Sequence, residues 1–99
     1  MKRLPPIPNI IPSILGPVPV EMVRDLRDMA GRACFGIWRA DRRDVRLEAN
    51  ADRRVQWQTY WHEWMHITLT DAGADMTEEW AERVCDAVGN ARTREMLDG

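Results

Sequence analysis

The alternation of apolar and polar residues divides the chain into an extended segment, a short helix, two strands and two long helices. Residues 1–20 contain all six prolines, which predicts a proline-rich extended arm with an edge strand near residues 14–20. From Glu21 to Ala30 the apolar residues recur at helical spacing, and Gly31 follows where a helix commonly ends. This pattern predicts a short amphipathic helix directly after the arm.

A β-hairpin is predicted in the middle of the chain. Residues 35–38 are mainly apolar, and residues 45–49 alternate between apolar and charged side chains. A polar turn separates the two runs, as expected between antiparallel neighbours. One face of this hairpin is therefore expected to pack on the core, and the other to face water.

Two long helices are predicted in the second half of the chain. Asp52 can cap a helix that runs to about Ala72, and Thr77 can cap another that runs to about Leu97. Together with the hairpin, they predict one small α+β domain over residues 21–99. In this domain a short antiparallel sheet packs on the first long helix and on the C-terminal helix.

Composition narrows the functional classes. The 99 residues carry 14 basic and 16 acidic side chains in no long block, for a net charge of −2, which argues against nucleic acid as a partner. Cys34 and Cys85 form no CxxC pair, which favours a reducing cytoplasmic setting over a disulfide framework. Prolines interrupt the apolar stretches near the start, so we expect a soluble protein without a targeting or membrane segment.

Both histidines of the chain belong to one motif, HEWMH, at residues 62–66. On a helix, His62 and His66 lie one turn apart on the same face, and Glu63 lies beside them. Zinc hydrolases hold their metal and their general base in this HExxH arrangement. The sequence therefore predicts a Zn²⁺ site with two histidine ligands.

The motif forms the polar stripe of an otherwise apolar helix. Thr59 and Thr70 share its narrow arc, whereas tryptophans and aliphatic residues occupy the remaining faces. Such a helix is expected to be buried, and polar groups buried without partners would cost about 1–3 kcal/mol each. A bound metal removes that cost. The tryptophans at helical core spacing, which we expect to be buried, are Trp57, Trp61, Trp64 and Trp80.

The third metal ligand has to come from outside the motif, because no third histidine exists. The short connection between the long helices predicts an antiparallel pair. His66 lies six residues before Ala72 and Glu82 lies five after Thr77, so at ~1.5 Å per residue both are about 8–9 Å from the turn. The order of preference for the third ligand is Glu82, then Glu78, then Asp86 or Cys85.

These residues resemble the gluzincin branch of the zinc metallopeptidases, in which an ExxxD sequence on the next helix follows HExxH. Residues 82–86 read ERVCD and fit that pattern. The layout of residues 35–88 is also similar to minimal zincin-like proteins of phages and prophages, and more distantly to ImmA/IrrE-type regulatory peptidases. The resemblance implies a zincin-like fold. The implied roles are zinc ligands for His62, His66 and Glu82, a general base for Glu63, and a partner that orients a ligand histidine for Asp86.

The function expected from this reading is a zinc-dependent metallopeptidase, in which Glu63 accepts a proton from the attacking water. A peptide or protein substrate would lie extended along a free sheet edge, either the strand at residues 44–50 or its neighbour. The alternative is a zinc-binding regulatory or interaction protein on the same scaffold, without turnover. A partner-binding domain without metal is the third possibility.

Overall fold

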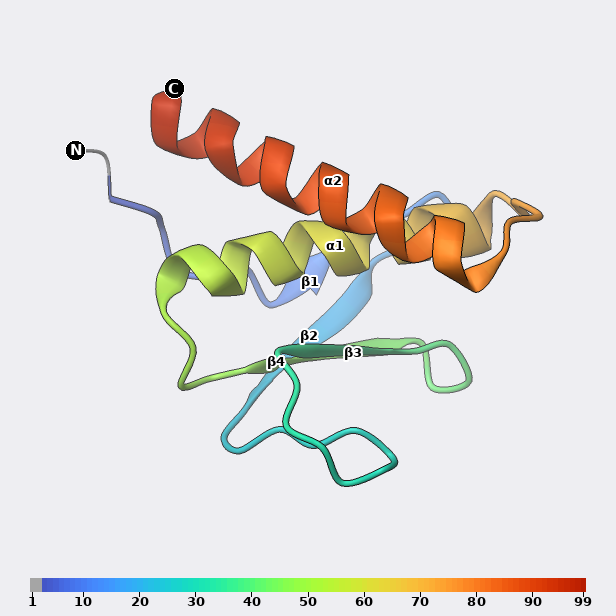
Figure 1. The fold of residues 1–99 in the computed structure, drawn as a ribbon, viewed down its shortest axis with the longest axis horizontal. Coiled ribbons are helices and arrows are strands. Elements are labelled where there is room, and N and C mark those ends of the chain that lie inside the picture. The colour runs from blue at the N-terminus through green and yellow to red at the C-terminus, as the bar shows by residue number, and fades with distance from the viewer. Residues whose placement is uncertain (1–2) are drawn as a thin grey trace.

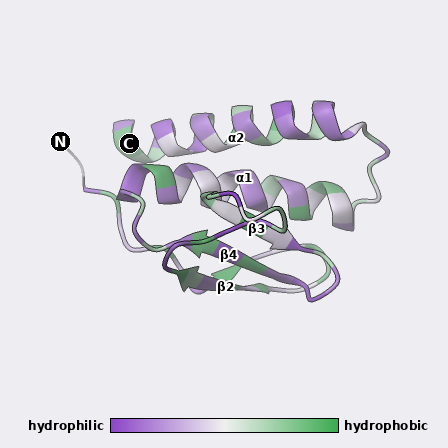
Figure 2. Cartoon of the chain, turned by 60° about the horizontal axis from the view of Figure 1, so that its bottom comes forward, coloured by the Kyte–Doolittle hydropathy of each residue, from purple (hydrophilic) through white to green (hydrophobic). Residues whose placement is uncertain are grey.

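The computed structural model of the chain describes residues 3–99. Figures 1 and 2 show three layers in this range: a small sheet, helix α1 on one face of the sheet, and helix α2 on the far side of α1. The helices are α1 (Arg53–Asp71) and α2 (Glu78–Asp98). The strands are β1 (Ile10–Ile11), β2 (Val18–Val23), β3 (Gly36–Arg39) and β4 (Asp44–Glu48). The predicted α+β class is confirmed.

The sheet is mixed, whereas the sequence predicted an antiparallel one. Within residues 3–99 its strand order is β1-β2-β4-β3. The β1–β2 and β3–β4 pairs are antiparallel, but β2 and β4 run parallel. Strand β4 therefore lies inside the sheet, and its hairpin neighbour β3 forms the edge. Of the two strands considered as a free edge, only β3 has that position in this sheet.

The helix predicted over Glu21 to Ala30 is wrong. Strand β2 occupies the first part of that segment, and a loop follows it. Val18, Val20 and Met22 alternate along β2, so these apolar side chains lie on one face of the strand, opposite the core residues of β4. The spacing of apolar residues in this segment fits both a helix and a strand. Pairing with β4 selected the strand.

The two long helices begin and end as predicted. The side chain of Asp52 accepts a hydrogen bond from the backbone of Val55, and Thr77 does the same for Trp80. Ala72 is the C-cap of α1, and Gly73 follows with φ of 67°, a conformation that favours glycine. No helix of residues 3–99 has both the length and the apolar content needed to cross a bilayer.

The core lies between the sheet and one side of α1. Its buried members are Ile11, Val18, Val45, Leu47, Trp57, Tyr60 and Ile67. The proline-rich segment covers this side, because Trp57 Nε1 donates to the carbonyl of Pro5 at 2.7 Å and the Tyr60 hydroxyl donates to that of Ile10 at 2.9 Å. The polar groups of both aromatic side chains are thereby satisfied.

The expectation for the tryptophans holds for three of the four. Trp57 is buried, and Trp61 and Trp64 are partly buried against the core. Trp80 is 60% exposed, so its predicted burial is wrong. It lies in the first turn of α2, and the guanidinium of Arg83 lies 5.4 Å from its ring.

Candidate metal centre

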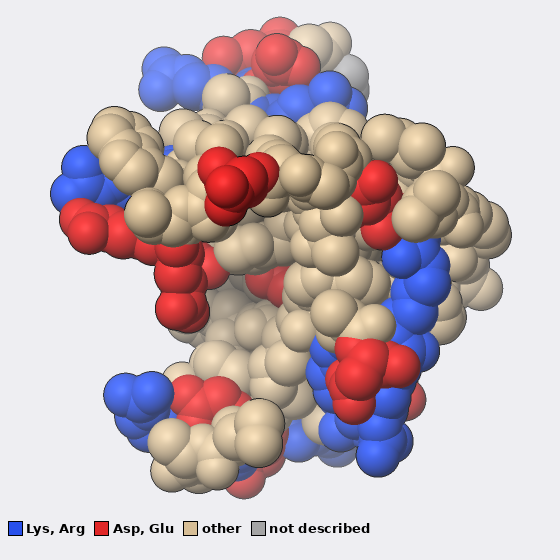
Figure 3. Space-filling model, turned by 90° about the vertical axis from the view of Figure 1, so that its right-hand side faces the viewer, with Lys and Arg blue, Asp and Glu red and all other residues tan. Residues whose placement is uncertain are grey.

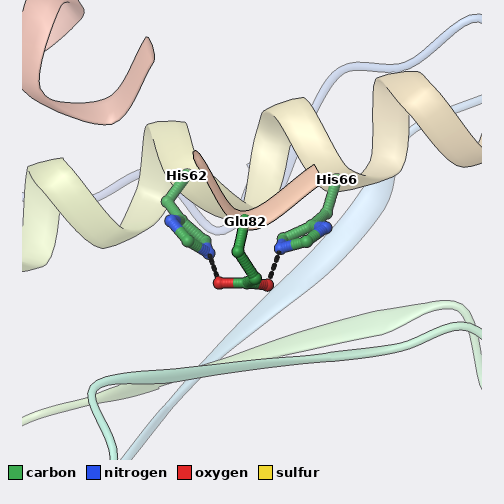
Figure 4. A group of neighbouring side chains, drawn as sticks. All are labelled: His62, His66 and Glu82. Carbon is green, nitrogen blue, oxygen red and sulfur yellow. Dashed lines mark ion pairs between the residues drawn. The ribbon is translucent and has the colours of Figure 1, made fainter. Parts of the chain in front are cut away.

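The three residues ranked first as metal ligands come together between the two helices. Nε2 of His66 lies 2.6 Å from Oε1 of Glu82, and Nε2 of His62 lies 3.4 Å from Oε2 of the same carboxylate. In Figure 4 both imidazoles of α1 point toward Glu82 of α2. Among residues 3–99, His62, His66 and Glu82 can each offer one ligand atom, with all three atoms within 4.8 Å of one another.

A glycine brings α2 close to α1 at this level. A Cβ atom at Gly89 would lie 2.6 Å from the carbonyl oxygen of Gln58 and 3.4 Å from the backbone nitrogen of His62. Any larger residue would push the helices apart. The close approach at Gly89 therefore sets how far Glu82 and Asp86, on the preceding two turns, reach toward the histidines.

Asp86 lies against the other nitrogen of His62. Its Oδ1 is 2.8 Å from Nδ1 of that imidazole. A carboxylate on Nδ1 fixes the proton there and leaves the lone pair of Nε2 free for a metal. The structure therefore brings the ExxxD aspartate to the side of His62 that faces away from Glu82.

Glu63 is buried beside the histidines. Its side chain is 6% exposed, and Nε2 of His62 lies 3.6 Å from its Oε1, which is longer than a hydrogen bond. Burial raises the pKa of this carboxyl to about 8, and the negative charge of Glu82 adds to the rise. A carboxylate in this setting readily accepts a proton.

The alternative ligands lie in different positions. Glu78 is exposed and lines the rim of the site, but it does not belong to the group of converging ligand atoms found among the described residues. Cys85 is fully buried, and burial raises the pKa of its thiol to about 12. A thiol with so high a pKa gives little thiolate, so Cys85 is a small core residue beside the site.

Two depressions meet at Glu63. One, of about 300 Å³, lies on the His62 side and is lined by Phe35, Val55 and Asn90 among others. The other, of about 600 Å³, lies on the His66 side. Gly36 of β3 borders both, so the edge strand runs along the base of the cleft. Figure 3 shows a hollow between a lip of acidic side chains and a lobe that carries both charges.

Several residues of the cleft were not identified from the sequence. They are Phe35, Gly36, Val55, Gln58 and Asn90 around the smaller depression, and Asp28, Arg32, Cys34 and Ile37 around the larger one. Of the cleft residues on α1 outside the motif, only Thr59 could be identified from the sequence, because it shares the polar arc of the motif. The loop residues could not be identified in this way, because their position depends on the Arg27–Ala33 bridge and on the pairing of β3 with β4.

The donor set fits a divalent metal that prefers nitrogen and oxygen. Two ligand atoms ~2.1 Å from a tetrahedral ion are about 3.4 Å apart, which matches the separation of Nε2 of His62 and Oε2 of Glu82. The contact between His66 and Glu82 is shorter, but the Glu82 side chain is 50% exposed and can rotate. Two imidazoles and one carboxylate form the ligand set of some catalytic zinc sites and also of non-haem iron sites.

Comparisons with protein-family models, with curated proteins and with solved structures gave no match to this chain.

Proposed function

We propose that this protein is a zinc-dependent metallopeptidase. The observation that carries the proposal is the convergence of His62, His66 and Glu82 beside the buried carboxylate of Glu63. A structural metal site has no use for a carboxylate held next to the ligands but outside them. A hydrolytic site needs one, because the attacking water has to lose a proton.

Each residue has a role that follows from its position. His62, His66 and Glu82 would hold the ion, and Asp86 would keep His62 in the tautomer that presents Nε2. The zinc ion supplies a Lewis acid that polarises the substrate carbonyl and makes a bound water more acidic. Glu63 takes the proton from that water and passes it to the leaving amine.

A polypeptide substrate suits the cleft. Strand β3 is the edge of the sheet beside the site, and its backbone can pair with an extended peptide. The depressions on either side of Glu63 would then receive side chains on the two sides of the cleaved bond. Zincin-like architecture and membership of the small HExxH peptidases are part of this proposal.

The test combines metal content with hydrolysis. Zinc is measured by elemental analysis after dialysis for the native chain and for His62→Ala, Glu82→Ala and Glu78→Ala. We expect about one zinc ion per chain in the native protein and in Glu78→Ala, which removes the matched carboxylate one turn away, and little zinc in the other two variants. A zinc-loaded sample is then incubated with a peptide library, and the cleavage products are identified by mass spectrometry.

Each outcome has a defined meaning. If the native protein takes up no zinc, the proposal is wrong. Unchanged zinc in Glu82→Ala would show that another residue completes the site. If zinc binds but the cleavage profile of the native chain equals that of Glu63→Gln, the protein is a zinc-binding protein without peptidase activity.

A further inference from the structure

The metal cleft continues around the edge strand into a second cavity, of about 800 Å³, that contains many arginines. Asp28, Arg32, Ile37 and Trp38 line both spaces, so the two are contiguous. The second cavity is bounded by the loop at residues 27–32, the turn after β3, and Arg46 of β4. A chain laid along β3 past Trp38 would enter it.

The charge lining this cavity is positive. Among the described residues it contains five arginines and two aspartates, Asp28 and Asp41. The arginines are Arg27, Arg32, Arg39, Arg42 and Arg46. The whole chain carries a net charge of −2, so this positive lining is a local feature.

Three of the arginines already have close partners. Arg39 binds Asp44 through two contacts of 2.7 and 2.5 Å, Arg27 lies 2.9 Å from Asp25, and Arg32 lies 3.3 Å from Asp28. These pairs account for the charges of Arg27, Arg32 and Arg39. They fix the walls of the cavity and add little attraction for a ligand.

The charges of Arg42 and Arg46 are not neutralised by a partner at such a short distance in the described part of the chain. Arg42 is exposed and forms no ion pair with any of the residues 3–99. Arg46 lies 4.0 Å from the nearest oxygen of Glu21, and its Nε is buried without a hydrogen-bond partner. Its side chain is 35% exposed, so a ligand oxygen can reach the guanidinium. Nε itself is closed to solvent, so an anionic ligand would bind the guanidinium through its exposed part.

The positive charges of the two arginines act on a carboxylate that already has a partner. Arg39 binds Asp44 and its hydrogen bonds hold the pKa of Asp44 below its usual value, and the charges of Arg46 and Arg42 lower this pKa further. Trp38 and Ile37 add an apolar wall on which the stem of an acidic side chain can pack.

We propose that this cavity, called here the arginine cavity, binds an acidic segment of a polypeptide through Arg42 and Arg46. The proposal deepens the proposed function, since the arginine cavity continues the cleft in which the substrate would lie. It names the substrate class as peptides with aspartate or glutamate residues a few positions from the cleaved bond. Extended chain advances about 3.3 Å per residue, so the two spaces are within reach of one short segment.

The test measures binding without turnover. The ¹⁵N-labelled protein is titrated with hexaglutamate, with hexaglutamine and with inorganic phosphate, and backbone amide shifts are followed by NMR. We expect hexaglutamate to bind about tenfold more tightly than hexaglutamine, with shifts at residues 37–46 and 27–32. The titration is repeated in the presence of a chelator. Shifts at residues 37–46 should persist, which separates this site from the metal centre.

Variants assign the binding to the two arginines. Arg42→Gln and Arg46→Gln should each weaken hexaglutamate binding about fivefold, since each removes one charge-assisted contact. The control is Arg94→Gln, which removes an equal charge from an 81% exposed side chain on α2. Arg42 lies in an exposed turn, so its replacement should leave the melting temperature unchanged.

Three results would overturn the proposal. Equal binding of hexaglutamate and hexaglutamine would show that charge plays no part. An equal loss of affinity in Arg42→Gln and Arg94→Gln would show a general charge effect instead of a site. Phosphate binding as tight as that of hexaglutamate would indicate a small oxyanion site and no peptide recognition. Because binding is measured with and without zinc, failure here leaves the peptidase proposal to its own test.

Discussion

Glu63 and Asp71 are carboxylates on the same helix, two turns apart, and both are buried. The side chain of Asp71 is 2% exposed and that of Glu63 is 6% exposed. Arg43 donates to both oxygens of Asp71 at 2.9 and 2.8 Å, and the hydroxyl of Ser13 donates as well. The contact of Glu63 with Nε2 of His62, at 3.6 Å, is longer than a hydrogen bond.

The surroundings move the two pKa values in opposite directions. Hydrogen bonds from Arg43 and Ser13 hold the pKa of Asp71 well below its usual range. Burial raises the pKa of Glu63 to about 8. Asp71 holds the β1–β2 turn through Ser13 and the β3–β4 turn through Arg43 against the end of α1. Its negative charge is paired with the guanidinium of Arg43. Glu63 can therefore hold a proton near neutral pH, and carboxyls with a pKa shifted in this way are frequent at functional sites.

Replacement of Glu63 should have the largest effect on function and a small one on stability. In Glu63→Gln the shape is kept but the proton acceptor is lost, so we expect peptide hydrolysis to fall by about 10²–10⁴-fold. Zinc content should not change, and the melting temperature should stay or rise, because a neutral amide replaces a carboxyl whose ionised form is costly to bury. Activity assays, elemental analysis and thermal unfolding measure the three quantities. Full activity in this variant would contradict the assigned role.

Under the proposed function, Asp86 would support the metal site without binding the ion. Loss of its charge in Asp86→Asn should lower zinc affinity by about 10–100-fold, since Nδ1 of His62 would lose its carboxylate partner. Competition with a chromophoric chelator measures this affinity. The matched control is Glu79→Gln on the same helix, whose exposed pair with Arg83 lies away from the site. Equal zinc affinity in both variants would mean that Asp86 does not position His62.

Replacement of Asp71 should give the reverse pattern to Glu63. Asp71→Asn removes the charge that holds Arg43 and Ser13, so thermal unfolding should shift down by several degrees. Zinc affinity should remain within about twofold of native, because the pair lies at the far end of α1. Unfolding followed by circular dichroism and a chelator competition test both parts. A variant with native stability but weakened zinc binding would reverse the comparison between the two carboxylates.

The sequence predicted the convergence of His62, His66 and Glu82 because its determinants are local. The HExxH spacing puts His62 and His66 on one face of a helix, and the caps Asp52 and Thr77 define where both helices begin. Counting residues from the turn was then sufficient to bring Glu82 level with the histidines. To bring these residues together in space, the two adjacent helices had only to pack as an antiparallel pair.

The rest of the cleft depends on contacts between distant segments. The chain from Glu21 to Ala30 has an apolar pattern that fits a helix, yet pairing with β4 makes its first part a strand. The loop that follows is held by Glu48, whose carboxylate accepts from the backbone of Leu26 at 2.8 Å. No periodicity encodes such a contact, and the partnership of Asp71 with Arg43 is equally non-local.

The smallest expected effect is a change in the pH dependence of stability. The folded pKa of Asp71 lies below the ordinary value of 3.8, so between these two values the unfolded chain binds more protons than the folded one. Stability from this group is therefore complete above pH 3.8 and is lost as pH falls through the folded pKa. The difference in unfolding free energy between native protein and Asp71→Asn should shrink steadily as pH falls below about 4.

Urea unfolding of chelator-treated protein at a series of pH values between about 6 and 2 measures this difference, because zinc binding has a pH dependence of its own. Glu78→Gln, which replaces an exposed carboxylate in the first turn of α2, provides the comparison for the loss of one acidic side chain. A difference for Asp71→Asn that stays constant down to the lowest pH would mean that the stabilisation comes from the shape of the side chain and its hydrogen bonds. In that case the contrast with Glu63 would be one of packing, and the charge of Asp71 would play no part in holding the two turns against α1.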